Sequence, residues 1–314
     1  MITLTDEQIQ KEYLMKHAIE DVKHVLQDLR DDGILQSVRT VLPVDEDSSM
    51  LYMPCISRAS KTSIIKTVSI FPTNASLPTT QGNVLVTDLS DGQHKATMDA
   101  SYLTRLRTGA MSAIATDKLA RKDAEVLGVI GTGNMGFEQV IGVVEVRDIK
   151  KIVLFNRTEE KAHHFAEQLK SAGVKAEFEV AAHVSEVIEK ADIINCATQS
   201  TEPVFEGRSL KPGVHINGVG SFKSSMREMD NETIQRADKI YVDDIEAIKE
   251  EAGELMYAVE QGVIGWDDIQ GSLVDYFDAP YLRESDAEIT LYKCVGAGYF
   301  DLAVASGVMR MFAE

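Results

Sequence analysis

The sequence has few cysteines and a deficit of basic residues, and both exclude classes of protein. Its 314 residues include three cysteines, Cys55, Cys196 and Cys294, which lie far apart and form no CxxC pair. This pattern argues against a disulfide framework or a zinc ribbon, so no metal is expected and a reducing cytoplasm is the simplest compartment. The 32 Lys and Arg residues face 50 Asp and Glu residues, a formal net charge of −18. Such a chain repels phosphate backbones and anionic membranes, so neither nucleic acid nor a membrane is an expected partner.

Long apolar runs, proline-rich segments and low-complexity tracts are also missing. The chain has seven prolines, and no stretch approaches the roughly eighteen consecutive apolar residues of a membrane span. The first residues show no basic region followed by an apolar core, so no export signal is expected. With 44% hydrophobic residues the chain can bury a large core, and its length favours two domains.

Two kinds of pattern divide the chain. An amphipathic helix after Thr5 and several extended segments indicate an α+β region, which is followed by a Leu- and Ala-rich helix over 102–120. Strand and helix patterns then alternate, as in a parallel sheet with crossover helices, and a boundary is predicted near Thr116. A last apolar helix is predicted over 293–311. The expected strands are 38–44, 50–55, 63–71, 83–89, 94–98, 125–130, 151–156, 192–197, 214–218 and 239–242.

A glycine-rich loop directly follows the first strand of the alternating region. The loop Gly131-Thr132-Gly133-Asn134-Met135-Gly136 leads into a helical pattern, which completes strand, loop and helix. Gly131 permits the tight turn, Gly133 lets the backbone approach a pyrophosphate, and Gly136 lets helix and strand pack closely. The helix start supplies N–H donors for phosphate. The loop therefore predicts a dinucleotide site of the Rossmann type.

The second strand of this region ends at Asn156-Arg157-Thr158, where an acidic residue normally binds the ribose hydroxyls of NAD. Asn156 supplies no carboxylate, whereas Arg157 and the Thr158 hydroxyl suit a 2′-phosphate. NADP(H) is therefore expected in preference to NAD(H), which stays possible. In the alternative interpretation, Arg157 is a solvated loop residue and Thr158 only caps the next helix.

Three basic residues of the first region lie in apolar surroundings. Lys66 shares a strand face with Ile64 and Val68, and Arg107 shares a helix face with Leu103 and Met111; Arg39 lies between apolar neighbours. A charge in such a place needs a partner. Each residue alone could form a structural ion pair, but three together favour an anionic substrate.

Nine segments carry a resemblance to the ornithine cyclodeaminase and mu-crystallin family of nicotinamide-dependent enzymes, and they span nearly the whole chain. They are QSVRTVLPV, KTVSIFPTN, LTRLRTGAMSAIAT, GVIGTGNMG, LFNRTEEKA, ADIINCATQSTEPVFEG, LKPGVHINGVGS, REMD and YVDDIEAIKEEAGEL. The resemblance implies an α/β fold in which a Rossmann-type doubly wound domain, residues 116–292, is inserted into an α+β substrate-binding and dimerisation domain. That domain comprises residues 1–115 and 293–314. The resemblance also implies a homodimer.

The resemblance assigns roles to individual positions. Arg39, Lys66 and Arg107 match substrate-site and catalytic positions, Arg107 also touches the cofactor, and Val295 joins the substrate contacts. The positions implied to bind the cofactor besides Arg107 and the loop glycines Gly131, Gly133 and Gly136 are Thr79, Thr108, Asn134, Met135, Asn156, Arg157, Thr158, Thr198, Val219 and Cys294.

One departure from the family indicates the branch. Ornithine cyclodeaminases resemble one another in a GGDxPGK segment, and here Phe222 and Met226 replace its aspartate and lysine. A phenyl ring accepts no proton, so the chain looks more like the ketimine reductases. The expected activity is an oxidoreductase that uses NADPH to reduce 1-pyrroline-2-carboxylate or 1-piperideine-2-carboxylate to proline or pipecolate.

Two alternatives stay open at this stage. The first keeps the fold but makes the protein an ornithine cyclodeaminase or an NAD-dependent dehydrogenase of alanine or an opine-like amino acid. The second is a non-catalytic NADPH-binding protein, because a cofactor loop alone does not prove turnover.

Overall fold

The computed structural model describes residues 1–37 and 39–312 and divides them into two compact units. The first unit comprises 1–107 with the end of the chain from Ala297, and the second comprises Thr108–Gly296. The first boundary falls inside helix α3 (Ser101–Leu119), and the second follows strand β15 (Thr290–Lys293). The sequence placed these boundaries at 115/116 and 292/293, since a continuous helix gives no local signal of where its packing partners change.

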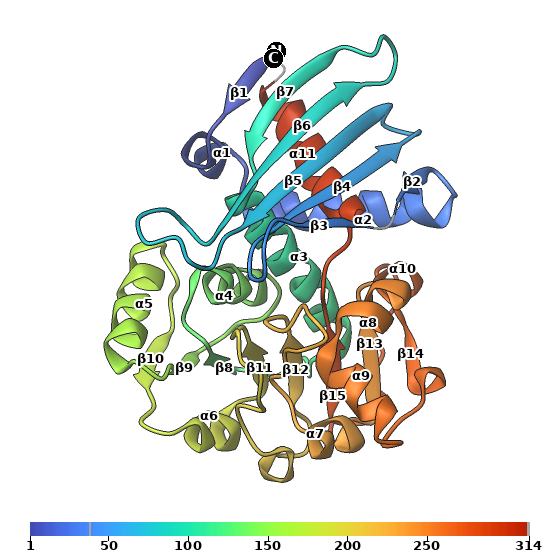
Figure 1. Cartoon of the computed structure of the whole chain (residues 1–314). Helices are drawn as coiled ribbons and strands as arrows, with labels where there is room; N and C mark the ends of the chain where they lie inside the picture. Colours follow the sequence, from blue (N-terminus) through green and yellow to red (C-terminus); the bar gives the residue numbers. More distant parts are fainter. Residues whose placement is uncertain (38, 313–314) are drawn as a thin grey trace. The chain divides into compact units, whose positions relative to one another are not determined.

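The first unit contains a seven-stranded sheet in the order β1-β7-β6-β5-β4-β2, with β3 also paired to β4 (Figure 1). All neighbours in this sheet are antiparallel except β1 and β7. The strands are β1 Ile2–Leu4, β2 Ile34–Gln36, β3 Thr40–Pro43, β4 Ser49–Ser57, β5 Thr62–Ile70, β6 Thr80–Asp88 and β7 His94–Asp99. Sequence patterns located five of them, and missed the three-residue strands β1 and β2. The expected strand 38–44 starts at Val38, outside the described residues.

The helices of this unit pack on one another and on the sheet. The expected first helix is two helices, α1 (Asp6–Glu12) and α2 (Met15–Arg30). Thr5 caps α1 as predicted, and the chain then turns at Tyr13, whose buried hydroxyl donates to Asp21 at 2.6 Å. The last helix, α11 (Gly298–Phe312), contacts α2, β4 and β5. It begins later than predicted because Lys293 belongs to strand β15.

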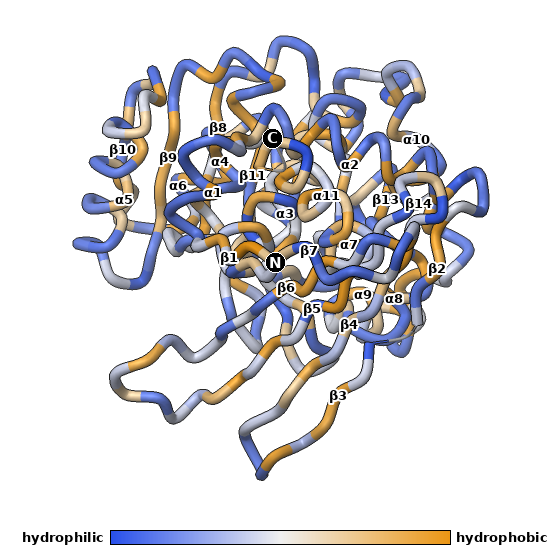
Figure 2. Tube along the Cα trace, turned by 90° about the horizontal axis from the view of Figure 1, so that it is seen from above, coloured by the Kyte–Doolittle hydropathy of each residue, from blue (hydrophilic) through white to orange (hydrophobic). Residues whose placement is uncertain are grey.

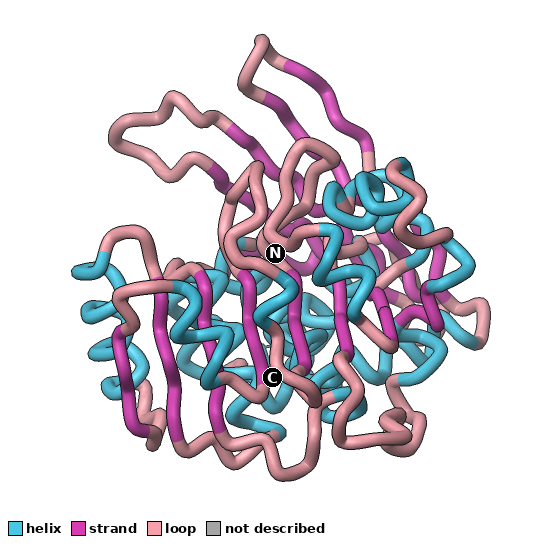
Figure 3. Tube along the Cα trace, turned by 90° about the horizontal axis from the view of Figure 1, so that it is seen from below, coloured by secondary structure: helices cyan, strands magenta, loops and turns pink. Residues whose placement is uncertain are grey.

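The second unit is built on an eight-stranded parallel sheet in the order β10-β9-β8-β11-β12-β15-β13-β14. Its strands run side by side (magenta in Figure 3). They are β8 Val126–Ile130, β9 Lys151–Phe155, β10 Glu177–Val180, β11 Ile193–Cys196, β12 His215–Gly218, β13 Lys239–Val242, β14 Ile269–Ser272 and β15. The helices are the C-terminal part of α3 and α4 Asn134–Val146, α5 Glu159–Ser171, α6 Val184–Lys190, α7 Asn231–Arg236, α8 Ile245–Glu251, α9 Gly253–Glu260 and α10 Leu273–Tyr276.

Helices cover both faces of this sheet, as its apolar strands predict. Leu127 and Val129 of β8 pack into a core with α4 and α5, whereas Ile130 belongs to a second core with α6 to α9. Because successive residues of a strand point to opposite faces, the two cores lie on opposite sides of the sheet. This is the doubly wound arrangement expected from the sequence.

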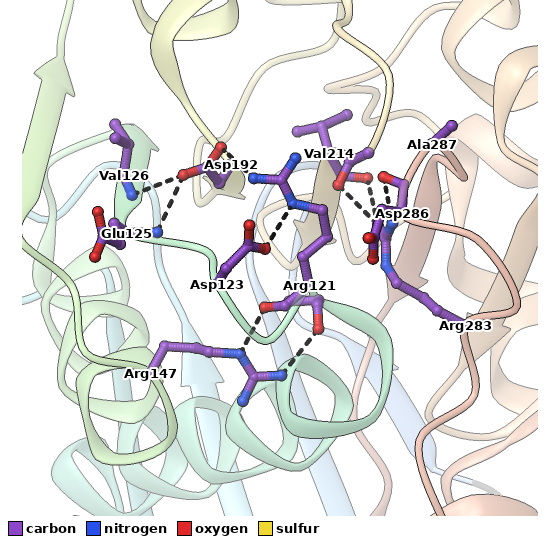
Figure 4. Close-up of polar contacts among 12 residues, drawn as sticks. Arg121, Asp123, Glu125, Val126, Arg147, Asp192, Val214, Arg283, Asp286 and Ala287 are labelled. Atoms are coloured by element: carbon purple, nitrogen blue, oxygen red, sulfur yellow. Dashed lines mark hydrogen bonds and ion pairs between the residues drawn. The ribbon is translucent and has the colours of Figure 1, made fainter.

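Buried arginines secure the C-terminal end of α3 (Figure 4). Arg147 donates to the carbonyl oxygens of Thr116 and Ala120 at 2.9 Å, and Arg283 donates to those of Leu119 and Gly213. Cations at a helix C-terminus satisfy its free carbonyls and oppose its dipole. These arginines therefore fix the C-terminal part of α3, which itself belongs to the second unit.

Two negative findings apply to the described residues. None of their helices is both long and apolar enough to cross a membrane. Within 1–37 and 39–312, no three His, Cys, Asp or Glu side chains gather as metal ligands would.

Candidate active site

The glycine loop after β8 has the geometry that its sequence predicts. Gly131 has a φ of +97°, and a Cβ there would lie 2.7 Å from the Ala197 carbonyl oxygen. A Cβ at Gly136 would collide with the carbonyl oxygen of Gly131, so the helix packs directly against the turn. A Cβ at Gly133 would meet nothing within 4 Å. The loop therefore packs tightly against the protein at Gly131 and Gly136, and leaves free space beside Gly133 at the start of α4.

The residues around this opening fit a dinucleotide phosphate. Gly133 is the N-cap of α4 and offers no side chain to the first N–H groups of the helix. The Thr132 Oγ1 is buried and has no hydrogen-bond partner among the described residues. Open N–H groups and an unmatched hydroxyl are the donors that an anionic phosphate needs.

The segment after β9 is tied to the glycine loop through Asn156. Its Oδ1 accepts a hydrogen bond from the Thr132 N–H at 3.4 Å, and its Nδ2 donates to the Thr158 carbonyl at 3.0 Å. Arg157 is exposed, and Thr158 is the N-cap of α5 but makes no side-chain cap bond. Thr158 therefore stands at the N-cap, as the alternative interpretation has it, although its hydroxyl makes no cap bond.

Other positions implied to bind cofactor gather at the carboxyl edge of the parallel sheet. Thr198 follows β11, Val219 follows β12 and Cys294 follows β15, and these strands are neighbours in the sheet. Asn134 and Met135 begin α4 after β8, the next strand in this order. Ligands of open parallel sheets bind beyond this edge. Val295 also lies here, whereas Thr108 is buried on α3 and Thr79 is exposed in the first unit.

A cluster of cations forms in the first unit around one carboxylate. Lys66 on β5 is 3% exposed and donates to Asp301 Oδ1 at 2.9 Å. The Arg107 Nε of α3 donates to the same oxygen at 3.3 Å. The prediction that Lys66 points inward is confirmed, as is the apolar setting of Arg107 beside Leu103. Burial of these two charges is costly, and their shared ion-pair partner on α11 offsets that cost.

Electrostatics place Arg39 beside this pair. Burial lowers the pKa of Lys66 to about 8; Asp301 opposes that shift, while Arg107 and Arg39 add to it. Burial alone would raise the pKa of Asp301, but Lys66, Arg107 and Arg39 outweigh it, so this pKa is lowered. All three cations thus favour the charged form of Asp301.

Asp301 is the member of this cluster that sequence reasoning missed. It is the one acidic residue in the largely apolar helix 298–312 and is 2% exposed. A lone carboxylate inside an apolar helical pattern was therefore an available signal, because such a residue needs a buried partner.

His215, the first residue of strand β12, has a structural role. It is fully buried, its Nδ1 lies 2.9 Å from Thr290 Oγ1, and its Nε2 lies 3.1 Å from Asn217 Oδ1. Asn217 Nδ2 donates onward to Asn195 and to Thr116. Burial lowers the pKa of His215 to about 3, so the ring is neutral. A neutral ring with both nitrogens engaged supports packing and leaves no free acid or base.

The sequence matches the ornithine cyclodeaminase/mu-crystallin family over residues 1–313, almost its full length. The chain belongs to this family. It is 37% identical to a Delta(1)-pyrroline-2-carboxylate reductase of Bacillus cereus, in an alignment that covers 100% of this chain and 97% of that protein. It is 36% identical to the ketimine reductase mu-crystallin of Mus musculus, over 88% of this chain and 84% of the relative.

A solved member of the family has the same fold. The Delta(1)-pyrroline-2-carboxylate reductase of Thermococcus litoralis, whose structure is in complex with NADH and L-proline, superposes with a TM-score of 0.93. It is 33% identical, and the match covers 99% of this chain and 97% of that one. The Rossmann-type fold expected from the glycine loop is thereby confirmed.

Proposed function

We propose that the protein reduces a small cyclic ketimine carboxylate, 1-pyrroline-2-carboxylate or 1-piperideine-2-carboxylate, with NADPH, and yields proline or pipecolate. The observation that carries the proposal is the cation cluster around Asp301, in which the buried Lys66 and Arg107 form ion pairs with the carboxylate and the half-buried Arg39 acts on it electrostatically. Guanidinium and ammonium groups gathered in one place suit the binding of a substrate carboxylate. The names of the Bacillus and Thermococcus relatives support the same substrate class.

The protein is an oxidoreductase of this family, and its residues can be given roles in the reduction. A nicotinamide cofactor, when bound, would supply the hydride needed to reduce the imine carbon. Arg39 and Arg107 hold the substrate carboxylate, because guanidinium groups bind carboxylates in a fixed, two-point geometry. The imine nitrogen gains a proton as it becomes an amine.

Lys66 is our candidate for the source of that proton. With a pKa of about 8, its ammonium group is mostly protonated at neutral pH yet gives up its proton more readily than an ordinary lysine. Asp301 holds the ammonium group in place through the 2.9 Å bond. Asp301 also keeps the group charged, since its own charge raises the pKa of Lys66.

The segment that distinguishes cyclodeaminases lacks its chemistry here. Phe222 is half-buried, and Met226 is buried at the positions of the family's aspartate and lysine. Neither side chain can move a proton. This observation favours the reductase over ornithine cyclodeamination.

NADPH is proposed because of the exposed Arg157 and the absence of a carboxylate at Asn156. The cofactor in the Thermococcus structure is NADH, so the two cofactors need direct comparison. Arg157→Ala should weaken NADPH binding by about tenfold and leave NADH binding within about twofold. An unchanged affinity for NADPH would remove the argument for phosphate recognition.

A homodimer is proposed from the resemblance and from exposed apolar residues of strand β3. Val41 and Leu42 are 52% and 51% exposed, although successive strand residues point to opposite faces. Among the described strands, β4 is the one neighbour of β3, so the other edge of β3 has no strand paired to it there. Figure 2 shows this hydrophobic strand in orange. An exposed apolar edge strand of this kind is typical of a surface that packs against another protein chain.

A substrate panel tests the proposed activity. Purified protein is mixed with each cyclic ketimine and either NADPH or NADH, and separately with ornithine or alanine and NAD. We expect oxidation of NADPH with at least one cyclic ketimine. Formation of proline and ammonia from ornithine without ketimine reduction would overturn the proposal. Tight NADPH binding without oxidation by either ketimine would instead favour a binding protein.

A further inference from the structure

Two loops at the carboxyl edge of the parallel sheet pack directly against each other. One begins with Thr198 after β11, and the other runs from Val219 to Ser221 after β12. A Cβ at Gly220 would collide with the backbone nitrogen and oxygen of Thr198. The backbones are therefore in contact, and only glycine fits between them.

Glu228 joins these loops through its carboxylate. Its Oε1 accepts a hydrogen bond from the Thr198 N–H at 2.5 Å, and its Oε2 accepts from the N–H groups of Gly220 at 2.8 Å and Ser221 at 3.3 Å. The side chain is fully buried. Each carboxylate oxygen thus holds a different loop, which an amide with a single acceptor oxygen cannot do.

A buried ion pair extends this link to a third strand. Lys293 at the end of β15 forms an ion pair with Glu254 at 3.1 Å and donates to the Ser221 carbonyl oxygen at 2.6 Å. The Ser221 hydroxyl donates to Glu254. All four side chains, Glu228 included, are at most 1% exposed. Such a buried and interlocked network resists movement of the loops that it holds.

We propose that Glu228 is a positioning residue of the cofactor site: it fixes the loops that carry Thr198 and Val219 in their binding conformation before the cofactor arrives. The inference rests on the proposed role of these two positions in cofactor binding. Loops that are held in advance lose little freedom when a ligand binds, so affinity is higher. The side chain acts through main-chain N–H groups and need not touch the cofactor.

The variant Glu228→Gln tests the proposal, with Asp230→Asn as a matched control. Asp230 lies in the same REMD segment and also accepts main-chain hydrogen bonds, from Gly207 at 3.0 Å and Thr233 at 2.8 Å. It holds a different part of the unit, where Gly207 packs on α7. Both variants lose an acceptor for a main-chain N–H, but only Glu228→Gln releases a loop of the cofactor site.

Three measurements distinguish a positioning role of Glu228 from a purely structural role. They are the dissociation constant for NADPH, the unfolding temperature, and whether the KM for NADPH changes without a change in kcat. We expect Glu228→Gln to raise the NADPH dissociation constant and the KM for NADPH about tenfold, while kcat at saturating cofactor stays within about threefold. Asp230→Asn should lower the unfolding temperature and leave the dissociation constant within about twofold. Equal loss of unfolding temperature in both variants, with unchanged NADPH affinity, would overturn the inference.

Hydrogen exchange of the unaltered protein keeps the inference testable if Glu228→Gln does not fold. The amides of Thr198, Gly220 and Ser221 should exchange slowly without cofactor and change little when NADPH is added. Fast exchange that slows only with NADPH would show that the loops are not held in advance. Failure of the unaltered protein to bind NADPH or NADH at all would instead contradict the proposed function.

Discussion

The pKa of the buried Lys66 ammonium group depends on the carboxylate of Asp301. Burial lowers this pKa to about 8, and Asp301 opposes this shift. In Asp301→Asn the pKa of Lys66 should therefore fall further, so binding of an anionic ketimine should weaken at a lower pH than in the unaltered protein. The KM for 1-pyrroline-2-carboxylate, measured between about pH 6 and 9, gives both midpoints. Loss of the buried partner should also cost about 3–5 kcal/mol of unfolding free energy, measured in urea.

Lys66→Arg is the control for this pH dependence. The guanidinium stays charged across the whole range, so the fall in affinity near pH 8 should disappear. The imine nitrogen of the substrate titrates identically in every variant, so differences between them isolate residue 66. An unchanged midpoint in Lys66→Arg would mean that another group titrates.

His215 should make the protein sensitive to acid. Its pKa is about 3 in the folded protein against an ordinary value of 6.5. Between about pH 3 and 6.5 the unfolded chain therefore binds a proton at this residue, whereas the folded protein does not. Stability therefore falls as pH drops below about 6.5, by about 2 kcal/mol at pH 5. Urea unfolding of the unaltered protein and His215→Gln, between about pH 7.5 and 5, should show the steeper loss in the former. Parallel losses would assign the acid sensitivity to other groups.

At the scale of elements, sequence patterns predicted those with strong local signals. Five of the eight strands of the parallel sheet were located because they are apolar runs followed by turns, and the glycine loop was located by the spacing of its glycines. Strands β10, β14 and β15 were missed. Strands β1 and β2 were missed because three residues show no period. The break at Tyr13 was missed because its apolar spacing continues from α1 into α2.

The candidate site was predictable only in part, for a related reason. Lys66 and Arg107 stood out as charges in apolar patterns, but their shared partner Asp301 lies far along the chain on α11. Glu228 was missed because its carboxylate binds main-chain N–H groups, which leave no residue pattern. Long-range pairing and main-chain contacts are set by tertiary packing, which local sequence does not encode.

The strand–loop–helix element supports a prediction that separates binding from folding. In Gly133→Ala, the added methyl group meets no protein atom within 4 Å, so unfolding free energy should drop by less than about 1 kcal/mol. The same methyl group would fill the opening where phosphate approaches, so NADPH affinity should fall at least about tenfold. Titration of NADPH fluorescence and urea unfolding measure the two effects.

Gly136→Ala is the opposite control within the same element. Its methyl group would collide with the Gly131 carbonyl oxygen, so about 1–3 kcal/mol of stability should be lost. If Gly133→Ala bound NADPH as tightly as the unaltered protein, the opening at the start of α4 would not be the phosphate site.

For the whole molecule, the net charge of −18 is compatible with the proposed binding of a small anion, because the net charge and the binding site concern different parts of the protein. The acidic excess describes the chain as a whole, whereas the cations that matter are buried on β5 and α3 with one carboxylate on α11. A buried cluster is screened far less by salt than surface charges are. Salt should therefore affect the encounter with substrate more than the strength of the bound contacts.

At the scale of the whole molecule, the exposed apolar strand β3 leads us to expect a homodimer. Light scattering of the unaltered protein should give twice the 34.6 kDa mass of one chain. In Leu42→Glu, a charge replaces a 51% exposed leucine on this apolar strand, so the dimer should dissociate at micromolar concentration. Leu89→Glu is a matched control, since Leu89 is 41% exposed but follows the end of β6, and it should leave the mass unchanged. A dimeric Leu42→Glu variant would place the subunit contact elsewhere, and a monomeric unaltered protein would exclude the dimer.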